Sequence, residues 1–398
     1  MKQFKKVPSL LTLITALSIL QCFPQECPEC DQDNKAAYEY EIISANTQPA
    51  LASNLIAEIS YDSLGDRLLI STQAGGFSIL DNTSIFTTAT DPTISSNNIL
   101  SSAGQSKILT STLGSNGTSY IDYFDATTWN KSFANSTITK YSKIIFNGTS
   151  FFVLEDKRID ENLSLDIPAT TVQSSLHLVK DYSNTLGVGT NVIRNVDHTQ
   201  TNIDAISMQG QAIVDIDIDK DNDIIALGYT WLNSNEIKLG LFRYLAADLN
   251  NKNTGTAIDP IIFGQAWETP TALAYNDRSV NSSIIEDFYL ATKQGLYQLE
   301  VNGYSSIFSV VRYYFDGTSW VQGNAISSII INSMTVIGGN LWMATNKGIS
   351  ILRADFEILN TTNSSLPSNN VFSIASFGGF IYAATDAGLI KIKEIAIP

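Results

Sequence analysis

The segment Gly338–Arg353, GGNLWMATNKGISILR, recurs forty residues later as Gly378–Lys393, GGFIYAATDAGLIKIK. Each copy contains an apolar run, a Thr-x-x-Gly turn and a second apolar run, which is the pattern of two antiparallel strands joined by a tight turn. Two further copies are Asp287–Glu300 (DFYLATKQGLYQLE) and Gly65–Leu80 (GDRLLISTQAGGFSIL). A set of short strands that recurs at a fixed spacing indicates a repeat protein.

The spacing of the copies predicts the architecture. Most centres lie about forty residues apart, which is the length of one four-stranded propeller blade. We therefore predict an all-β fold, a single β-propeller over residues 37–398, with eight blades favoured and seven as the alternative. An irregular β-sandwich is the other fold that such short strands permit. The eight centres are Thr72, Thr112, Leu154, Thr190, Gly228, Thr292, Thr345 and Thr385.

A polar segment, SLPSNNVFSIA (365–375), comes before the last strand–turn–strand copy. Together with LWMATNKGISIL (341–352) it resembles the propeller repeat of bacterial two-component regulators, most closely in the first repeat and the last two. The resemblance covers most of the chain after about residue 37. In those sensors a membrane span and a kinase follow the propeller, whereas this chain ends inside the last repeat. We therefore expect no signalling output on the same polypeptide.

The two ends of the repeat region complement each other. The last repeat supplies strands at Val371–Ser376, Phe380–Thr385 and Leu389–Ile395, without an outer fourth strand. A strand at Tyr38–Ser44 comes before the first repeat and has no blade of its own. Pairing the two would close the ring and remove an exposed edge. We predict that the N-terminal strand completes the last blade.

The first residues have the pattern of an export signal. MKQFKK is basic, and the apolar run after it is too short for a comfortable membrane span but suits a secretory signal. The motif ILQC, which ends at Cys22, resembles a bacterial lipobox, with Gln21 where a small residue is usual. The resemblance implies a signal peptide over 1–21, lipid on Cys22 and a flexible tether over 22–36. Ordinary cleavage near Ala16 is the alternative.

These features predict the cellular location of the protein. We expect an exported outer-membrane lipoprotein that faces the periplasm or the cell surface and touches the membrane through its lipid only. Cys27 and Cys30 remain as a pair that could form a small disulfide in an oxidising compartment. With 39 acidic and 24 basic residues the net charge is −15, which disfavours nucleic acid as a partner. We expect a monomer.

Motifs for catalysis are scarce. The chain has only two histidines, His177 and His198, and no G-x-S-x-G sequence. We therefore predict no catalytic residues, and we expect a non-catalytic binding or scaffold protein of the cell envelope. A propeller hydrolase, lactonase or lyase with a metal in the central channel is the alternative.

One acidic stretch invites a metal-binding interpretation. In DIDIDKDNDIIALG (215–228), Asp217, Asp219 and Asp221 alternate as the carboxylates of calcium loops do. The competing interpretation is that KDND forms the turn of the repeat's own hairpin. Apart from this calcium ion, we expect no cofactor.

A partner-binding surface follows from the repeat. In a propeller, the loops before the inner strands and the turns between the second and third strands share one face, which we call the turn face. Its polar, amide-rich residues suit hydrogen bonds to a protein or peptide edge. The alternative is that they only satisfy turn backbones. The predicted residues are Asn54, Asn98 and Asn370 from the loops, and Gln73, Lys293, Asn346, Lys347 and Asp386 from the turns.

Overall fold

The computed structural model describes most of the repeat region. The described residues are 37–63, 65–73, 76–81, 86–89, 98–104, 107–113, 119–124, 129–135, 141–146, 151–155, 175–179, 193–196, 212–233, 236–245, 257–263, 268–280, 283–302 and 306–395. The predictions for the signal, the tether, Cys22, Cys27 and Cys30 lie outside them. Tyr38–Glu394 forms one compact unit. Within the described ranges, no helix has the length and apolar character to cross a membrane.

The described strands form seven antiparallel sheets. The first four are β2 (Ile56–Asp62), β3 (Arg67–Thr72), β4 (Gly76–Asp81) and β5 (Phe86–Ala89); β6 (Asn98–Gly104), β7 (Lys107–Leu113), β8 (Ser119–Phe124) and β9 (Trp129–Asn135); β10 (Tyr141–Phe146), β11 (Phe151–Glu155), β12 (Ser175–Val179) and β13 (Ile193–Val196); and β14 (Ala212–Ile218), β15 (Ile224–Asn233), β16 (Glu236–Tyr244) and β17 (Ala257–Phe263).

The other three sheets follow in chain order, except that the last also takes the first strand. They are β18 (Pro270–Val280), β19 (Ser283–Thr292), β20 (Gly295–Asn302), β21 (Ser306–Phe315) and β22 (Trp320–Gln322); β23 (Ile331–Ile337), β24 (Asn340–Thr345), β25 (Gly348–Leu352) and β26 (Phe356–Leu359); and β27 (Val371–Phe377), β28 (Phe380–Thr385) and β29 (Gly388–Ile395) with β1 (Ala37–Ile43).

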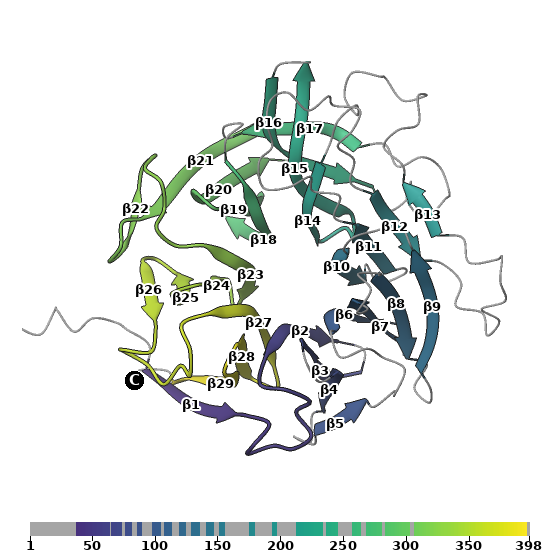
Figure 1. Cartoon of the computed structure of the whole chain (residues 1–398). Coiled ribbons are helices and arrows are strands. Elements are labelled where there is room, and N and C mark those ends of the chain that lie inside the picture. The colour runs from purple at the N-terminus through teal and green to yellow at the C-terminus, as the bar shows by residue number, and fades with distance from the viewer. Residues whose placement is uncertain are drawn as a thin grey trace, which may run out of the picture. The chain divides into compact units, whose positions relative to one another are not determined.

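The sheets are arranged around a central axis as blades (Figure 1). The innermost strands, called inner strands below, are β2, β6, β10, β14, β18, β23 and β27. The predicted all-β propeller is therefore confirmed. Six of the sheets have four strands, and the one that begins at β18 has five.

The number of described sheets is lower than the eight blades that the sequence favours, and equals the alternative of seven. Seven of the eight predicted centres lie on the second strand of a sheet of their own. The eighth, Thr190, lies outside the described residues, between β12 and β13 of the sheet centred on Leu154. The strands of this sheet extend from Tyr141 to Val196. The centres Leu154 and Gly228, which belong to consecutive sheets, therefore lie almost two repeats apart in the chain.

The ring closes as predicted. β1 pairs with β29, so the last sheet has the order β1-β29-β28-β27. Lys391 Nζ lies 3.1 Å from Glu41 Oε2 across this pair. Tyr38 also joins the neighbouring blade, where its hydroxyl donates to Glu357 Oε2 over 2.7 Å and accepts from Arg353 Nη2 over 3.0 Å.

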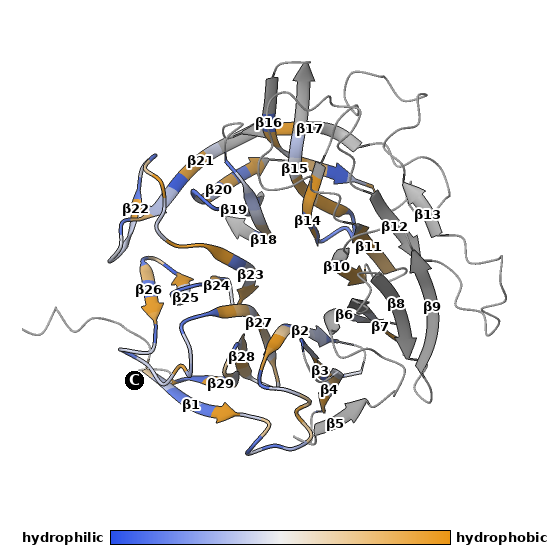
Figure 2. Cartoon of the chain, in the orientation of Figure 1, coloured by the Kyte–Doolittle hydropathy of each residue, from blue (hydrophilic) through white to orange (hydrophobic). Residues whose placement is uncertain are grey.

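The core lies between consecutive blades. Because the middle strands are covered on both faces, they carry continuous buried runs instead of alternating patterns, as in β24 (NLWMAT) and β28 (FIYAAT). One interblade cluster packs Trp342 and Ile349 of one sheet against Ile381 and Ile390 of the next. In Figure 2 hydrophobic segments fall within β11, β14 and β20.

The recurring Thr-x-x-Gly turn has a hydrogen-bonding basis. Thr345 donates its hydroxyl to the Gly348 carbonyl over 2.7 Å and accepts the Lys347 amide over 3.1 Å, and Thr385 repeats both bonds with Gly388 and Ala387. The glycines have φ of +114° and +127°, a conformation that side chains with Cβ rarely adopt. The turn therefore needs both residue types.

Each inner strand has an irregularity in its register close to its start. The shifts fall between Ile56 and Glu58 in β2, and at the corresponding place in β6, β10, β14, β18, β23 and β27. Such a bulge reorients the residues that follow it. It therefore helps to decide which inner-strand side chains face the centre of the ring.

Candidate functional site

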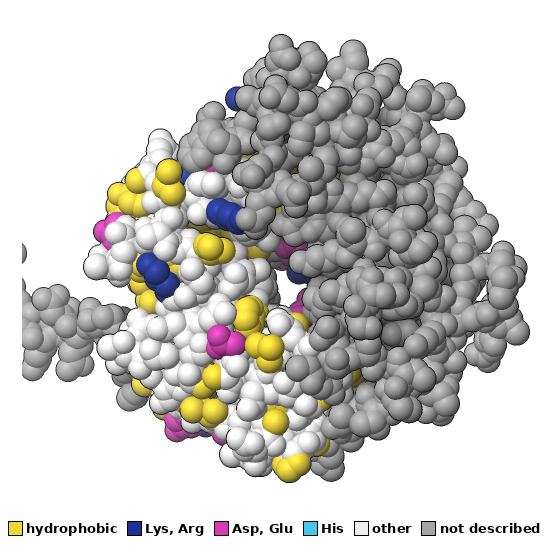
Figure 3. Space-filling model, in the orientation of Figure 1, with side chains coloured by type: hydrophobic (Ala, Val, Ile, Leu, Met, Phe, Trp, Pro, Cys, Tyr) yellow, Lys and Arg dark blue, Asp and Glu magenta, His cyan; other side chains and the backbone are white. Residues whose placement is uncertain are grey.

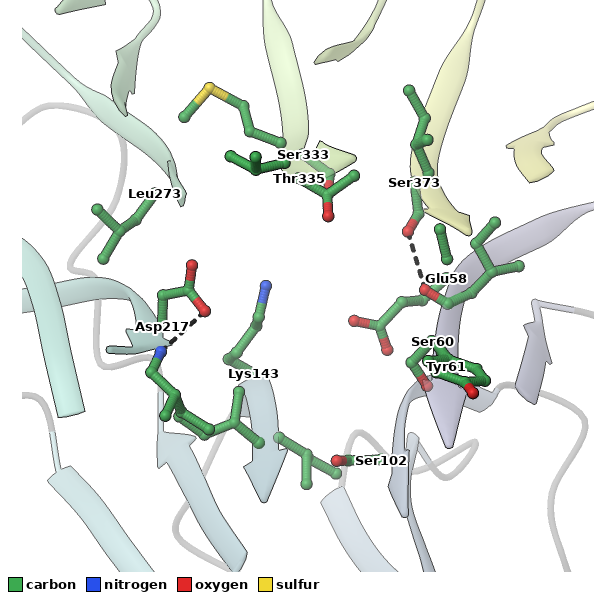
Figure 4. Close-up of a pocket in the computed structure, with 18 of the residues that line it drawn as sticks. Glu58, Ser60, Tyr61, Ser102, Lys143, Asp217, Leu273, Ser333, Thr335 and Ser373 are labelled. Atoms are coloured by element: carbon green, nitrogen blue, oxygen red, sulfur yellow. Dashed lines mark hydrogen bonds between the residues drawn. The ribbon is translucent and has the colours of Figure 1, made fainter. Parts of the chain in front are cut away.

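The centre of the ring contains a cavity of about 450 Å³. Residues of all seven inner strands line it, and Glu58, Lys143 and Asp217 bring charged groups into it from three different blades (Figure 4). Hydroxyl groups make up much of the remaining polar wall: Ser60, Ser102, Ser333, Thr335 and Ser373. In the space-filling view, acidic and basic side chains are visible inside the central hollow (Figure 3).

Two aspartates of β14 bind the edge of the next inner strand. Asp215 Oδ2 accepts the Leu273 amide over 2.8 Å, and Asp217 Oδ2 accepts the Tyr275 amide over 3.0 Å. An inner strand has a sheet neighbour on one side only, so its outward amides need other partners. The aspartates supply these partners and join two blades at the wall of the cavity.

Other inner strands make similar links. Asn332 Nδ2 donates to the Val371 carbonyl over 2.6 Å, and Ser373 Oγ donates to the Ile59 carbonyl over 3.2 Å. Each bond runs from one inner strand to the next around the ring. Part of the polar wall therefore has a structural role.

Lys143 is the basic group among these acids. Its ammonium lies 3.5 Å from Asp215 Oδ1. The charge of Asp215 raises the pKa of Lys143, with smaller contributions from Glu58 and Asp217, and these outweigh the opposing effect of burial. Lys143 is therefore positively charged at neutral pH.

Asp217 is an acid of the cavity wall whose pKa is raised. Burial raises its pKa to about 6, although the charge of Lys143 and the amides of Ile218 and Tyr275 act in the opposite direction. Removing a carboxylate from water disfavours its charged form. At neutral pH Asp217 is therefore ionised at an energetic cost.

The turn face brings its two sets of segments together. The amide of Gln73 donates to the Leu55 carbonyl over 2.9 Å, and the amide of Asn346 donates to the Ile330 carbonyl over 3.1 Å. Lys293 makes the equivalent bond to Thr269 over 2.8 Å. In each case a turn residue bonds to the segment just before the inner strand of the same blade.

The predicted partner-binding side chains differ in whether they already form hydrogen bonds within the chain. Asn54 Oδ1 accepts the Ala45 amide over 2.6 Å, and Asn346 Oδ1 accepts the Ile330 amide over 2.9 Å, so both also support local backbone. Asn370 Nδ2 lies 3.5 Å from Asp386 Oδ2. Exposed residues of the set are Gln73, Asn346, Lys347 and Asp386, half-buried ones are Asn54, Lys293 and Asn370, and the side chain of Asn98 lies outside the described part. Their role in partner binding stays a prediction.

The acidic stretch forms the predicted hairpin turn between β14 and β15. Arg243 Nη2 lies 3.0 Å from Asp219, 3.2 Å from Asp221 and 2.7 Å from Asp223, so one guanidinium pairs with three aspartates of this turn. Asp219 also accepts the amides of Asp221 and Asp223, each over 2.9 Å. Asp217 points to the central cavity instead (Figure 4). The calcium site predicted on Asp217, Asp219 and Asp221 stays a prediction.

Within the described ranges, no three His, Cys, Asp or Glu side chains come together as metal ligands would. The backbone of His177 lies in β12, and His198 lies outside the described residues. The alternative of a propeller enzyme with a metal in its channel is not tested by this geometry.

Comparison with solved structures supports the architecture. The extracellular domain of BT4673 from B. thetaiotaomicron, described as a hybrid two component system, matches 90% of this chain with a TM-score of 0.54 and 15% identity. The β-propeller domain of Cps50 (Swd1) from Myceliophteria thermophila matches 90% with a TM-score of 0.52 and 11% identity. The fold is a β-propeller. At such low identity the likeness extends to the fold alone.

The matches differ in length and kind. The chain spans 40% of the BT4673 chain and all of the Cps50 propeller domain. No known protein family matches the sequence, and no curated protein matches it. A propeller fold is consistent with a binding or scaffold role.

Sequence reasoning missed the charged cavity wall. Glu58 and Lys143 are isolated charges in otherwise ordinary strand segments, and they lie 85 positions apart in the chain. A usable signal is that each stands directly after the bulge of an inner strand, as Asp215 does. The repeat identifies inner strands, but the bulge positions become visible only in the structure.

Proposed function

We propose that the protein is a non-catalytic binding or scaffold protein of the bacterial cell envelope, and that its turn face docks a protein or peptide. The observation that carries this proposal is a pair of exposed isoleucines on that face. Ile326 is 68% exposed and Ile330 is 38% exposed. Apolar groups within a polar surrounding are typical of protein interfaces.

Backbone contacts place these isoleucines on the turn face. The neighbour of Ile326, Ser327, donates its amide to the Gln294 carbonyl in the β19–β20 turn over 2.8 Å. Ile330 exchanges two hydrogen bonds with Asn346 of the β24–β25 turn. The segment before β23 therefore lies across the turns of two adjacent blades.

Polar groups surround the pair in a way that suits an interface rim. Lys347 is exposed, and its ammonium lies 5.5 Å from the Phe315 ring centroid and 3.4 Å from Ser328 Oγ. Rim hydrogen bonds with apolar anchors at the centre are the usual anatomy of a docking surface. The anchors here would be Ile326 and Ile330.

A photo-crosslinking residue at position 326 tests the proposal in living cells. The matched control is position 310, because Val310 is 46% exposed but lies on β21, at the outer rim of the ring. We expect one predominant crosslinked envelope protein from position 326 and none of it from position 310. Equal crosslinking from both positions would contradict the proposal.

Substitutions then measure the contribution of the face. Ile326→Asp, and separately the triple change of Asn346, Lys347 and Asp386 to Ala, should each lower recovery of that protein at least tenfold, or about 1.4 kcal/mol. An unchanged melting temperature would show that the fold survives. Unchanged recovery would move the site to the opposite face or the outer rim.

The cellular address belongs to the same proposal. The basic and apolar N-terminal residues support export, and the likeness to a domain described as extracellular agrees with it. We expect lipid on Cys22 and a monomeric protein held at the outer membrane. Labelling with a fatty-acid analogue should mark the wild type but not Cys22→Ser, and equal labelling of both would refute lipidation.

A further inference from the structure

Residues 323–330, which we call the docking segment, carry both exposed isoleucines of the turn face but belong to no strand. They connect the end of β22 to the start of β23 (Figure 1). A segment without the hydrogen-bond ladder of a strand can take many conformations, and ordering it on binding costs free energy. The contacts that fix its conformation in the free protein therefore affect how tightly Ile326 and Ile330 can dock.

One buried guanidinium binds the first half of the docking segment. Arg312 of β21 is 8% exposed, and its Nη1 donates to the carbonyls of Gly323 over 3.3 Å and Ala325 over 2.9 Å. Its Nη2 donates to the Gln294 carbonyl in the β19–β20 turn over 3.1 Å. Arginine has five N–H groups in a planar fork, so one side chain can join several segments. Arg312 thus joins the docking segment to a turn of its own blade.

Glu268 fixes the position of this guanidinium. Its Oε1 accepts Arg312 Nε over 3.2 Å and lies 3.0 Å from Nη2, and its Oε2 accepts the Tyr297 hydroxyl over 2.6 Å. Glu268 is buried, and its backbone carbonyl accepts the hydroxyl of Tyr229, in β15 of the preceding blade, over 2.9 Å. A buried ion pair with satisfied hydrogen bonds is costly to break. The guanidinium therefore stays in place whether or not a partner is bound.

Backbone and hydroxyl groups hold the second half of the docking segment. The amides of Ser327 and Ser328 donate to the carbonyls of Gln294 over 2.8 Å and Phe315 over 2.9 Å. The hydroxyl of Ser327, which is buried, accepts the Phe315 amide over 3.2 Å. Ile326 lies in the chain directly between the guanidinium contacts and these bonds. Its placement on the surface therefore depends on both halves.

We propose that Arg312 is a positioning residue for docking, which holds the docking segment in its binding conformation before the partner arrives. Ile326 is then presented to the partner at a reduced cost in conformational entropy, which raises affinity. Because Arg312 is buried, it acts through the segment that it binds. This inference rests on the proposed function, since it concerns the surface proposed there to dock a protein.

Hydrogen exchange of the free protein tests the positioning without any partner. Arg312→Lys keeps a positive charge near Glu268 but lacks the planar fork of five donors. We expect the backbone amides of residues 323–328 to exchange at least tenfold faster than in wild type, while those of β20 and β24 keep their protection. Unchanged exchange in residues 323–328 would overturn the proposal. Equal increases in β20 and β24 would also overturn it, because Arg312 would then support the whole fold.

A double variant serves the same purpose if Arg312→Lys does not fold. Arg312→Met combined with Glu268→Gln removes both buried charges, so neither remains without its partner, and glutamine can still accept the Tyr297 hydroxyl. The same local loss of protection is expected. Arg353→Met is the control, because Arg353 follows β25 at the end of that strand remote from the turn face. Faster exchange of residues 323–328 in the control would contradict a specific role of Arg312.

Crosslinking from position 326 connects the order of the segment to docking. With protein levels matched, Arg312→Lys should lower the yield of the predominant crosslinked protein at least fivefold, and Arg353→Met should not. Faster exchange with an unchanged yield would show that the order of the segment does not matter for docking, and the proposal would be wrong. No crosslink from position 326 in wild type would refute the proposed function instead, because the exchange result would still show that Arg312 holds the segment.

Discussion

At the scale of single residues, side chains of one blade complete the hydrogen bonding of the next. Asp215 and Asp217 bind amides of β18, Asn332 binds a carbonyl of β27, and Ser373 binds a carbonyl of β2. An unpaired buried amide or carbonyl costs about 1–3 kcal/mol. Polar groups at the centre of the ring thus stabilise the contacts between blades.

Asp217 makes stability depend on pH in a direction opposite to that of most acids. Its pKa is about 6 when folded, above the ordinary 3.8, so the folded state binds more protons between pH 4 and 6 and stability falls as pH rises. We expect Asp217→Asn to remove this loss. The free energy of unfolding of the variant relative to wild type should rise by about 2 kcal/mol from pH 4 to pH 7. Urea unfolding at both values measures it, with Asp386→Asn as the baseline, and a constant difference would contradict it.

Arg243 of β16 is a cation among acids, because its guanidinium lies against the acidic turn between β14 and β15. Asp219 and Asp223 are buried, and both lie within 3.0 Å of its guanidinium. Arg243→Gln should therefore lower the free energy of unfolding by about 3 kcal/mol, since it removes a countercharge that lies next to two buried carboxylates. Thermal unfolding of the variant checks this. Recovery of stability with millimolar Ca²⁺ would support the calcium prediction, and a wild-type melting temperature without calcium would contradict the role of Arg243.

At the scale of elements, the strand–turn–strand unit could be predicted from the sequence almost residue by residue. Its Thr, its Gly and its continuous apolar runs each have a local cause that short-range patterns reveal. The role of the N-terminal strand as the fourth strand of the last blade was also predictable. The sequence of β1 resembles that of β26, and the loops after both strands share polar residues. Sequence alone left eight blades and seven blades both open, because the strands of the β10–β13 sheet are far enough apart in the chain to resemble an additional repeat.

The charged cavity was beyond sequence reasoning for a different physical reason. Alternation along a strand says which residues share a side, but a one-residue bulge reverses the sides. Glu58 and Lys143 can be placed at the centre only when the bulge position is known. The residues of the turn face were predictable as turns, whereas the exposed Ile326 lies in a segment outside the repeat pattern.

Gly388 is the turn residue that contacts the closing strand. A Cβ at this position would lie 2.8 Å from the Ile43 carbonyl oxygen of β1, and φ is +127°. We expect Gly388→Ala to cost about 2 kcal/mol or more, because it combines backbone strain with a clash. Gly378→Ala is the matched control: φ is +58° and no atom lies within 4 Å of the new Cβ, so the cost should be near 1 kcal/mol. Thermal unfolding measures both, and equal losses would contradict the contact with β1.

At the scale of the whole molecule, β1 holds the ring together. It completes the sheet of β27–β29, and Tyr38 connects it to Arg353 and Glu357 of the preceding blade. Apolar clusters on both sides of this sheet include β1 residues, Ile43 in one and Tyr38 and Tyr40 in the other. Loss of one strand should therefore weaken two interblade contacts at once.

Deletion of residues 37–43 tests this role. We expect the shortened protein to associate into dimers or larger species, because the exposed edge of β29 can pair with another chain. Size-exclusion chromatography with light scattering measures the change, and a synthetic peptide of residues 37–45 should restore the monomer. A deletion variant that remained monomeric and kept the wild-type melting temperature would show that closure is dispensable.

The pairing of β1 with β29 also sets an order of events in folding. The Lys391–Glu41 contact joins residues 350 positions apart, so it belongs to the slowest class of contacts a chain of this size can form. Blades made of consecutive strands can form as the polypeptide emerges, but β1 must wait until β29, near the end of the propeller, has been synthesised. During that interval β1 and the edge of β29 have unpaired backbone groups that can associate with other chains. A chaperone that shields either one would raise the yield of closed rings.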